Sequence, residues 1–157
     1  MQEEWSRWIF PSIKMMKKPI VLFVKGEQFY AGVEPETTEL MTEGVMETED
    51  GKIVLSYEET ELTGMEGTTT RFIIEGETVV LERTGTIQSQ MLFEQGKRNS
   101  SLYETPWGTM VVDIATTRLA HRLDERGGVM ELAFTIAVNH QVTGENRFKV
   151  RVKERAG

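Results

Sequence analysis

Residues 53–105 alternate between apolar and polar side chains over most of their length, and this alternation constrains the fold more than any other feature of the chain. Successive side chains of a β-strand point to opposite faces, so a period of two predicts half-buried strands. Glycines interrupt the pattern at regular intervals, as turns between short antiparallel strands do. The interruptions fall at Gly64, Gly67, Gly76, Gly85 and Gly96. The stretch therefore predicts a β-meander.

The same alternation continues on both sides of this stretch, and it predicts ten strands with no long helix between them. The expected ranges are 19–30, 37–48, 52–62, 68–75, 78–84, 86–94, 98–105, 109–119, 129–140 and 144–154. Such a series is typical of a closed barrel or a sandwich, and closure removes the exposed edges that a wide open sheet would have. We therefore expect an all-β fold, a closed antiparallel barrel of about 8–10 strands in meander order.

Several connections carry the residues that tight turns require. Asp50-Gly51 accepts the positive φ of a primed hairpin turn, and Gly76-Glu77 suits a type II′ turn. Pro19 is expected at the first position of its strand, where a residue need not donate to the ladder. The polar residues 121–128 are expected to form a loop with a short helical turn.

Residues 1–15 differ from the rest of the chain. Trp5, Trp8 and Ile9 lie at helical spacing, which predicts a short N-terminal helix that docks on the barrel. A loosely packed extension, or translation that starts at Met16, explains the segment more simply. The remaining residues, 16–157, are expected to form a single domain, because a chain of 157 residues is most often one domain.

The composition narrows the chemistry. The chain has no cysteine, which excludes disulfides and thiolate metal sites, and its net charge of -7 opposes binding to nucleic acid. His121 and His140 stand far apart without a carboxylate at a metal-binding spacing, so we expect neither a metal nor a cofactor. The sequence also lacks a phosphate-binding loop and a nucleophile elbow. We therefore predict no catalytic residues, and a binding protein in preference to an enzyme.

No segment has the character of a membrane span or a secretion signal. The longest apolar run, Ile20–Val24, is far shorter than the roughly twenty residues of a membrane helix. The first residues carry Glu3 and Glu4 where a secretory signal carries positive charge. The expected location is the cytoplasm, without a membrane partner.

Polar side chains on otherwise apolar strand faces are the candidate binding residues. Tyr57 and Glu59 continue one apolar face, and Arg83 continues another. If both faces point inward, Glu59 and Arg83 form a buried charged pair that orients the polar head group of a ligand. Tyr103 adds a hydroxyl donor. In the alternative, the charged residues lie solvated at the barrel mouth or neutralise each other, and the tyrosines only pack.

A cationic row marks the last strand. Arg147, Lys149, Arg151 and Lys153 share one face, which is typical either of an anionic partner or of a solvated outer face. The second interpretation is preferred, and the acidic face of residues 39–47 is a candidate neighbour if the two strands lie side by side.

Several separate segments resemble one known family. They are Tyr57–Gly76, Arg83–Gly85, Ser89–Arg98 and Tyr103–Gly108, and the likeness extends from Met16 to Lys153. In order and spacing they resemble the YwiB-like family of uncharacterised bacterial proteins. The resemblance implies a calycin-like, that is lipocalin-like, β-barrel, and it implies no activity and no agreed site.

Two functions follow as hypotheses. The first is a cytoplasmic protein that binds a small, partly apolar ligand inside the barrel, with Tyr57, Glu59, Arg83 and Tyr103 at the site. The alternative is a protein-interaction or homodimerisation module whose barrel is fully packed and holds no ligand. Trp107, in an expected turn, and the Trp5/Trp8 segment would then be the anchors.

Overall fold

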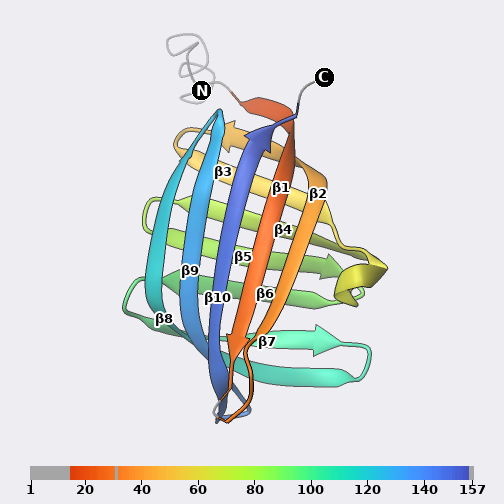
Figure 1. Ribbon diagram of the computed structural model, residues 1–157, viewed down its shortest axis with the longest axis vertical. Helices are drawn as coiled ribbons and strands as arrows, with labels where there is room; N and C mark the ends of the chain where they lie inside the picture. Colours follow the sequence, from red (N-terminus) through yellow and green to blue (C-terminus); the bar gives the residue numbers. More distant parts are fainter. Residues whose placement is uncertain (1–14, 31, 156–157) are drawn as a thin grey trace, which may run out of the picture.

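The computed structural model describes residues 15–30 and 32–155, and these form one closed antiparallel barrel of ten strands. Each strand pairs with its neighbours in the sequence, and β10 pairs with β1 to close the barrel (Figure 1). The strands are β1 (Met16–Phe29), β2 (Glu36–Glu49), β3 (Lys52–Glu58), β4 (Thr68–Glu75), β5 (Thr78–Gly85), β6 (Gln88–Glu94), β7 (Arg98–Thr105), β8 (Gly108–Asp124), β9 (Gly127–Val138) and β10 (Gln141–Glu154). The predicted all-β meander is confirmed. The predicted N-terminal helix lies outside the described residues.

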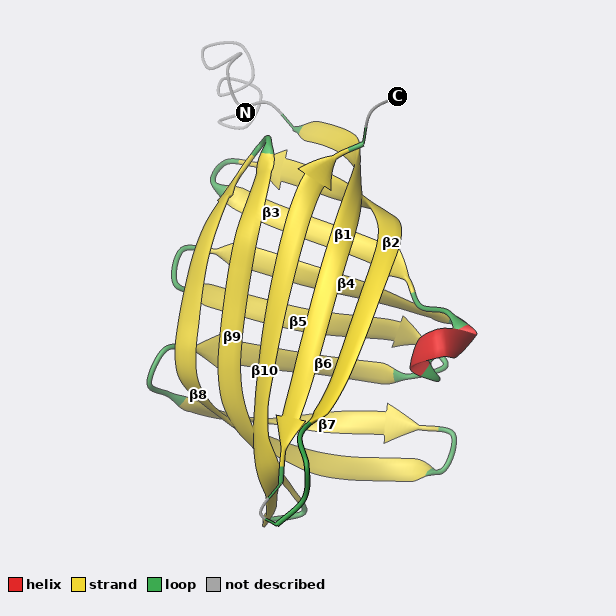
Figure 2. Ribbon diagram, viewed as in Figure 1, coloured by secondary structure: helices red, strands yellow, loops and turns green. Residues whose placement is uncertain are grey.

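The barrel wall has a long-stranded side and a short-stranded side. In Figure 1, β8, β9, β10, β1 and β2 run along the long axis, and the shorter strands β3–β7 cross behind them. The short 3-10 helix η1 (Glu61–Thr63), red in Figure 2, lies between β3 and β4. β6 and β7 are joined by only two ladder pairs, Gln88 with Glu104 and Ser89 with Tyr103. The Asn99 side chain adds a bond to the Leu92 carbonyl at 3.4 Å.

The core lies inside the barrel, because alternate residues of every strand point inward. Phe72, Phe93 and Phe134 are among its largest fully buried side chains. The rings of Phe93 and Phe134 pack with centroids 4.7 Å apart, a favourable separation for a tilted aromatic pair. This packing joins the short-stranded side to the long-stranded side of the wall.

The hairpin turns follow the predicted chemistry where Asp-Gly occurs. Asp50 and Gly51 both have positive φ, at 48° and 80°, as a type I′ turn requires. Asn139 and His140 form a second turn of the same kind, with φ of 49° and 70°, and so end β9 at Val138. The sequence prediction ran this strand on to residue 140, because its alternating pattern continued through the turn.

The prediction of a loop at residues 121–128 is wrong. β8 continues to Asp124, which pairs with Gly127 across a tight turn. Leu119 and Leu123 pack against the core, so the alternation of a strand continues through this segment although polar residues lie between the two leucines. The polar composition of the segment reflects its outward side chains and not a loop.

The third predicted strand was too long. β3 ends at Glu58, and η1 follows, with the Thr60 hydroxyl accepting from the Leu62 amide at 3.3 Å. Gly64 ends this turn in a left-handed conformation. Glu61 therefore lies outside the strand, whereas Glu59 still points inward because its amide donates to the Thr68 carbonyl at 2.8 Å.

Pro19 lies inside β1, whereas the sequence predicted it at the first residue of the strand. Its carbonyl accepts from the Arg155 amide, so its nitrogen faces the β10 side, where the β10 ladder has already ended at the pair of Ile20 and Glu154. The missing N–H therefore costs no bond to β2.

The cationic and acidic rows do not lie side by side, because β1 separates β10 from β2. Arg151 instead lies over the ring of Phe23 on β1, and Arg147 over the ring of Phe29, at 5.1 and 4.8 Å from the ring centroids. The cations are held by aromatic faces on the outer wall.

Candidate functional site

A cavity of about 480 Å³ lies inside one end of the barrel. The turns β1–β2, β3–β4, β5–β6, β7–β8 and β9–β10 surround this end, which we call the mouth, and β1 begins and β10 ends at the opposite end (Figure 1). All four predicted ligand residues, Tyr57, Glu59, Arg83 and Tyr103, line the cavity. They come from the ends of β3, β5 and β7, so the barrel brings together residues that are widely separated in the sequence.

One row of inward side chains crosses the short-stranded wall, and we call it the polar belt. Strand register joins its members pairwise from β3 to β7. The members are Tyr57, Thr70, Arg83, Ser89 and Tyr103. A continuous polar row inside a barrel is unusual, because burying hydroxyl and guanidinium groups in a packed core costs free energy.

The row directly below the polar belt is apolar. Leu55, Phe72, Leu81 and Met91 pair in sequence across β3 to β6 and are buried. On the opposite wall the rings of Phe148 and Phe134 form a tilted pair with centroids 5.8 Å apart, and both residues line the cavity. The cavity therefore has a polar side near the mouth and an apolar base.

Glu59 is the most unusual residue of the site. Its side chain is only 6% exposed, and neither carboxylate oxygen has a hydrogen-bond partner among the described residues. Burial raises the pKa of this carboxyl above its ordinary value, and the charge of Arg83 opposes that shift without cancelling it. The hydroxyl groups of Thr70 and Tyr57 lie near enough to lower this pKa further, although neither makes a hydrogen bond of normal geometry to the carboxyl group. A buried carboxyl group without partners lowers the stability of a fold, so its presence indicates a functional role.

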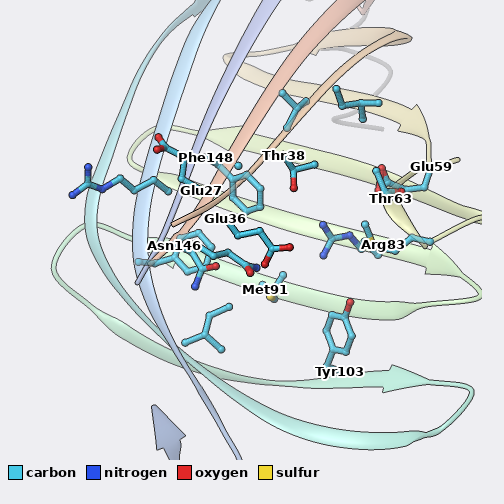
Figure 3. Close-up of a pocket in the computed structure, with 18 of the residues that line it drawn as sticks. Glu27, Glu36, Thr38, Glu59, Thr63, Arg83, Met91, Tyr103, Asn146 and Phe148 are labelled. Atoms are coloured by element: carbon cyan, nitrogen blue, oxygen red, sulfur yellow. The ribbon is translucent and has the colours of Figure 1, made fainter. Parts of the chain in front are cut away.

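Arg83 lies beside Glu59 but does not form an ion pair with it. No salt bridge within 4.0 Å joins the two in the described part of the chain, and Arg83 Nε is also buried without a partner. Both groups share the cavity, and the alternative in which they neutralise each other by direct contact finds no support in this geometry. The reason is the register: β4 separates their strands, and Glu59 lies beyond the end of β3. Figure 3 shows the guanidinium directed into the cavity instead.

The two tyrosines add hydroxyl groups to the belt. Burial is the main cause that raises the pKa of Tyr57, and the charge of Glu59 adds to it, so the phenol remains a protonated donor at neutral pH. Tyr103 is half-buried, and its hydroxyl points toward Arg83 in Figure 3. Both can donate to an anionic group held at Arg83.

Several lining residues were not predicted from the sequence. Asn146 lines the cavity from β10, and Thr70 and Ser89, which belong to the belt beside the cavity, have buried hydroxyl groups without a partner in the described chain. Each is a polar residue in an apolar row, the same signal that identified Tyr57, so the sequence did contain it. Glu36, which enters from the start of β2, had no such signal.

The two histidines lie outside this site. His121 Nε2 lies 2.8 Å from the Gly76 carbonyl, and His140 lies 3.4 Å from Asp113. The described residues contain no cluster of three or more histidine, aspartate or glutamate side chains placed to hold a metal. Within the same residues, no helix has the length and apolar character needed to cross a membrane.

The unpartnered carboxyl predicts an unusual stability profile. Because Glu59 binds its proton more tightly in the folded chain, stability falls as the pH rises from 4.5, its ordinary pKa, through the raised value. Glu59→Gln removes this loss, so we expect it to stabilise the barrel by about 1 kcal/mol at neutral pH. The gain should vanish below pH 4.5, and thermal unfolding across pH measures it.

Glu58→Gln is the matched control for this variant. Glu58 points outward and accepts from the Thr69 hydroxyl at 2.8 Å, so its replacement should produce no such gain at neutral pH. A Glu59→Gln protein that is less stable than the wild type at neutral pH would contradict the interpretation, since it would mean that the charge of Glu59 is satisfied.

Comparison with known proteins agrees with this fold. A family model described as "Domain of unknown function (DUF1934)" matches residues 23–150. The crystal structure of the ywiB protein from Bacillus subtilis superposes with a TM-score of 0.81 over 94% of this chain and 99% of that one, at 22% sequence identity. No protein with a curated description matches the sequence. The resemblance predicted from the separate segments is confirmed.

Proposed function

The chain belongs to the family of unknown function DUF1934, and from its cavity we propose that it is a cytoplasmic protein that binds one small, partly apolar molecule in the barrel mouth. The cavity volume of about 480 Å³ falls in the range of ligand pockets, which is roughly 300 to 1,000 Å³. A cavity of this size at the mouth of a small barrel is where such folds hold a ligand.

One observation carries the proposal: the buried charged groups of the cavity have no partners within the described chain. Glu59 offers two carboxylate oxygens and Arg83 offers Nε, and all three atoms are buried. A protein that used this end of the barrel only for packing would be more stable with apolar residues there. Their retention is explained if a ligand supplies the missing hydrogen bonds.

The apolar base of the cavity indicates that the other part of the ligand is apolar. Met91, Phe134 and Phe148 offer apolar surface below the polar belt. Burying the apolar part of a ligand there contributes about 25 cal/mol for each Å² removed from water. A methionine in the wall also adapts to ligands of different shape. The expected ligand is thus amphipathic, with its polar end toward the mouth.

Native mass spectrometry of the protein, purified without denaturation from the organism that encodes it, tests this proposal. We expect a reproducible extra mass of a few hundred daltons or less that is lost on denaturation, since a cavity of this volume admits one small molecule. Recombinant protein incubated with the released molecule should regain that mass. Bare protein in every preparation, with no small molecule recovered from the denatured sample, would contradict it.

A second candidate function has one observation in its favour. Trp107, in the β7–β8 turn, is 90% exposed, and three other apolar residues at the mouth are exposed: Val33 between β1 and β2, Leu62 in η1 and Val142 at the start of β10. Exposed apolar side chains that gather at one end can anchor a protein partner or a second copy. The same native spectra report the subunit count and so address this candidate. The cavity itself disagrees with a fully packed barrel.

A further inference from the structure

We infer that the cavity recognises a zwitterionic head group, with an ammonium group bound at Glu59 and a carboxylate or similar anion bound at Arg83. This inference rests on the proposed ligand-binding function and names the chemical class of the ligand. Its basis is the arrangement of opposite charges that share one cavity without touching.

The first step concerns Glu59. Its carboxyl group is more than nine-tenths buried, its two oxygens have no partner in the described chain, and it lines the cavity. A carboxylate accepts hydrogen bonds only, so the group that satisfies it must be a donor, and a cationic donor gives the strongest bond. A primary ammonium group has three N–H donors and fits both oxygens.

The second step concerns Arg83. Its Nε is buried without a partner, and the guanidinium is directed into the cavity (Figure 3). A guanidinium only donates, so its complement is an anionic acceptor, and a carboxylate matches its planar geometry. The hydroxyl of Tyr103 points toward the same place, and the protonated Tyr57 supplies another donor in the belt.

The third step excludes a ligand with a single charge. An anion alone would satisfy Arg83 but leave Glu59 unpartnered, and a cation alone would do the reverse. Glu27 and Glu36, both labelled in Figure 3, also line the cavity, so an anionic ligand would meet three carboxylates there. Arg147 lines the cavity as well, but it is exposed and paired with Glu145 at 3.3 Å, so Arg83 is the lining guanidinium that has a buried nitrogen without a partner among the described residues. A head group with both charges meets each requirement.

The spacing of the two charges favours a compact head group. Glu59 and Arg83 both line the same cavity, and none of the salt bridges within 4.0 Å among the described residues joins them, yet the charge of Arg83 still lowers the pKa of the Glu59 carboxyl group. A head group that carries its ammonium and carboxylate on one carbon atom can bridge such a gap. Below it, Met91 and Phe134 would contact an apolar chain. An apolar α-amino acid is the simplest molecule of this description.

Isothermal titration calorimetry with four matched probes tests the inference. The probes share a short alkyl chain and differ in the head group: 2-aminooctanoate carries both charges, octanoate the anion, octylamine the cation and octan-1-ol neither. We expect 2-aminooctanoate to bind at least about tenfold more tightly than each of the others, because it makes both charge-assisted contacts. A probe with one charge, or none, that binds as tightly would overturn the inference.

Two variants separate the contributions of the two contacts. Glu59→Gln should erase the preference for 2-aminooctanoate over octanoate, and Arg83→Gln should erase its preference over octylamine. Glu58→Gln, on the outer face, should change neither. If both variants retain both preferences while thermal unfolding shows them to be folded, the assignment of the charges is wrong.

The failure of the inference and that of the proposed function are distinguishable. Binding of octan-1-ol as tightly as 2-aminooctanoate would refute the zwitterionic head group but leave a ligand-binding barrel in place. Binding of none of the probes to the wild type, with no native ligand recovered by mass spectrometry, would refute both.

Discussion

Filling the cavity with two added phenyl rings, through Val24→Phe and Val112→Phe, is expected to weaken binding of 2-aminooctanoate at least about a hundredfold. Both side chains are buried and line the cavity, on β1 and β8. The rings would occupy the apolar part of a space of about 480 Å³, which the alkyl chain of the ligand needs. Calorimetric titration measures the loss of affinity.

The stability of this double variant is informative as well. Larger side chains forced into a packed core usually cost about 1–3 kcal/mol, whereas rings that enter existing space cost less. We therefore expect the free energy of unfolding to change by less than about 1 kcal/mol. The matched control is Val21→Phe with Val111→Phe, since these neighbours lie on the outer faces of the same strands and should leave affinity unchanged. Undiminished affinity in the filled barrel would place the ligand elsewhere.

Gly128→Ala is expected to lower the free energy of unfolding by about 3 kcal/mol or more, a larger loss than at any other position discussed for this chain. Gly128 has φ of +136°, which side chains rarely adopt, and it pairs with Leu123 at the β8–β9 turn. A Cβ atom at this position would lie 1.8 Å from the Arg122 carbonyl oxygen, so the backbone of two paired strands would have to move apart. Urea denaturation measures the difference in the free energy of unfolding.

Gly51→Ala is the control for this substitution. Gly51 also has positive φ, at +80°, but a Cβ atom there would meet nothing within 4 Å. Its replacement should cost about 1 kcal/mol, the conformational cost alone. If the two variants lose the same stability, close contact at Gly128 is not what requires the glycine.

Much of the barrel could be predicted because local pattern and fold agree. β4 and β7 begin and end at the predicted residues, since glycine or another turn residue bounds each alternating run. The predicted strand bounds were wrong where the alternation of apolar and polar residues does not coincide with the hydrogen-bonded ladder of the strand. The outward polar residues of β8 concealed its continuation to Asp124, and alternation carried the prediction of β9 through the turn at Asn139.

The site could be predicted in its residues but not in its geometry. Tyr57, Glu59, Arg83 and Tyr103 were recognisable as polar residues in apolar rows, and the barrel places them at one cavity. Their mutual distances depend on strand register and on where β3 ends, which no periodicity contains. For this reason the sequence left open whether Glu59 and Arg83 orient a ligand or neutralise each other, whereas the structure shows both Glu59 oxygens and Arg83 Nε buried without a partner among the described residues. The contribution of Glu36 likewise depends on the register of β2 with β1, in which Glu36 lies opposite Gln28.

The central claim, that a small amphipathic molecule enters the barrel mouth, is tested most directly by NMR of protein labelled with ¹³C at the methionine methyl groups. Met91 and Met110 line the cavity, Met46 and Met130 are buried away from it, and Met41 is exposed on the outer wall. On titration with 2-aminooctanoate, and with octan-1-ol if that does not bind, the account predicts saturable shifts of the Met91 and Met110 signals, with the other three unchanged. Unmoved Met91 and Met110 signals at saturating concentrations of both probes would contradict it.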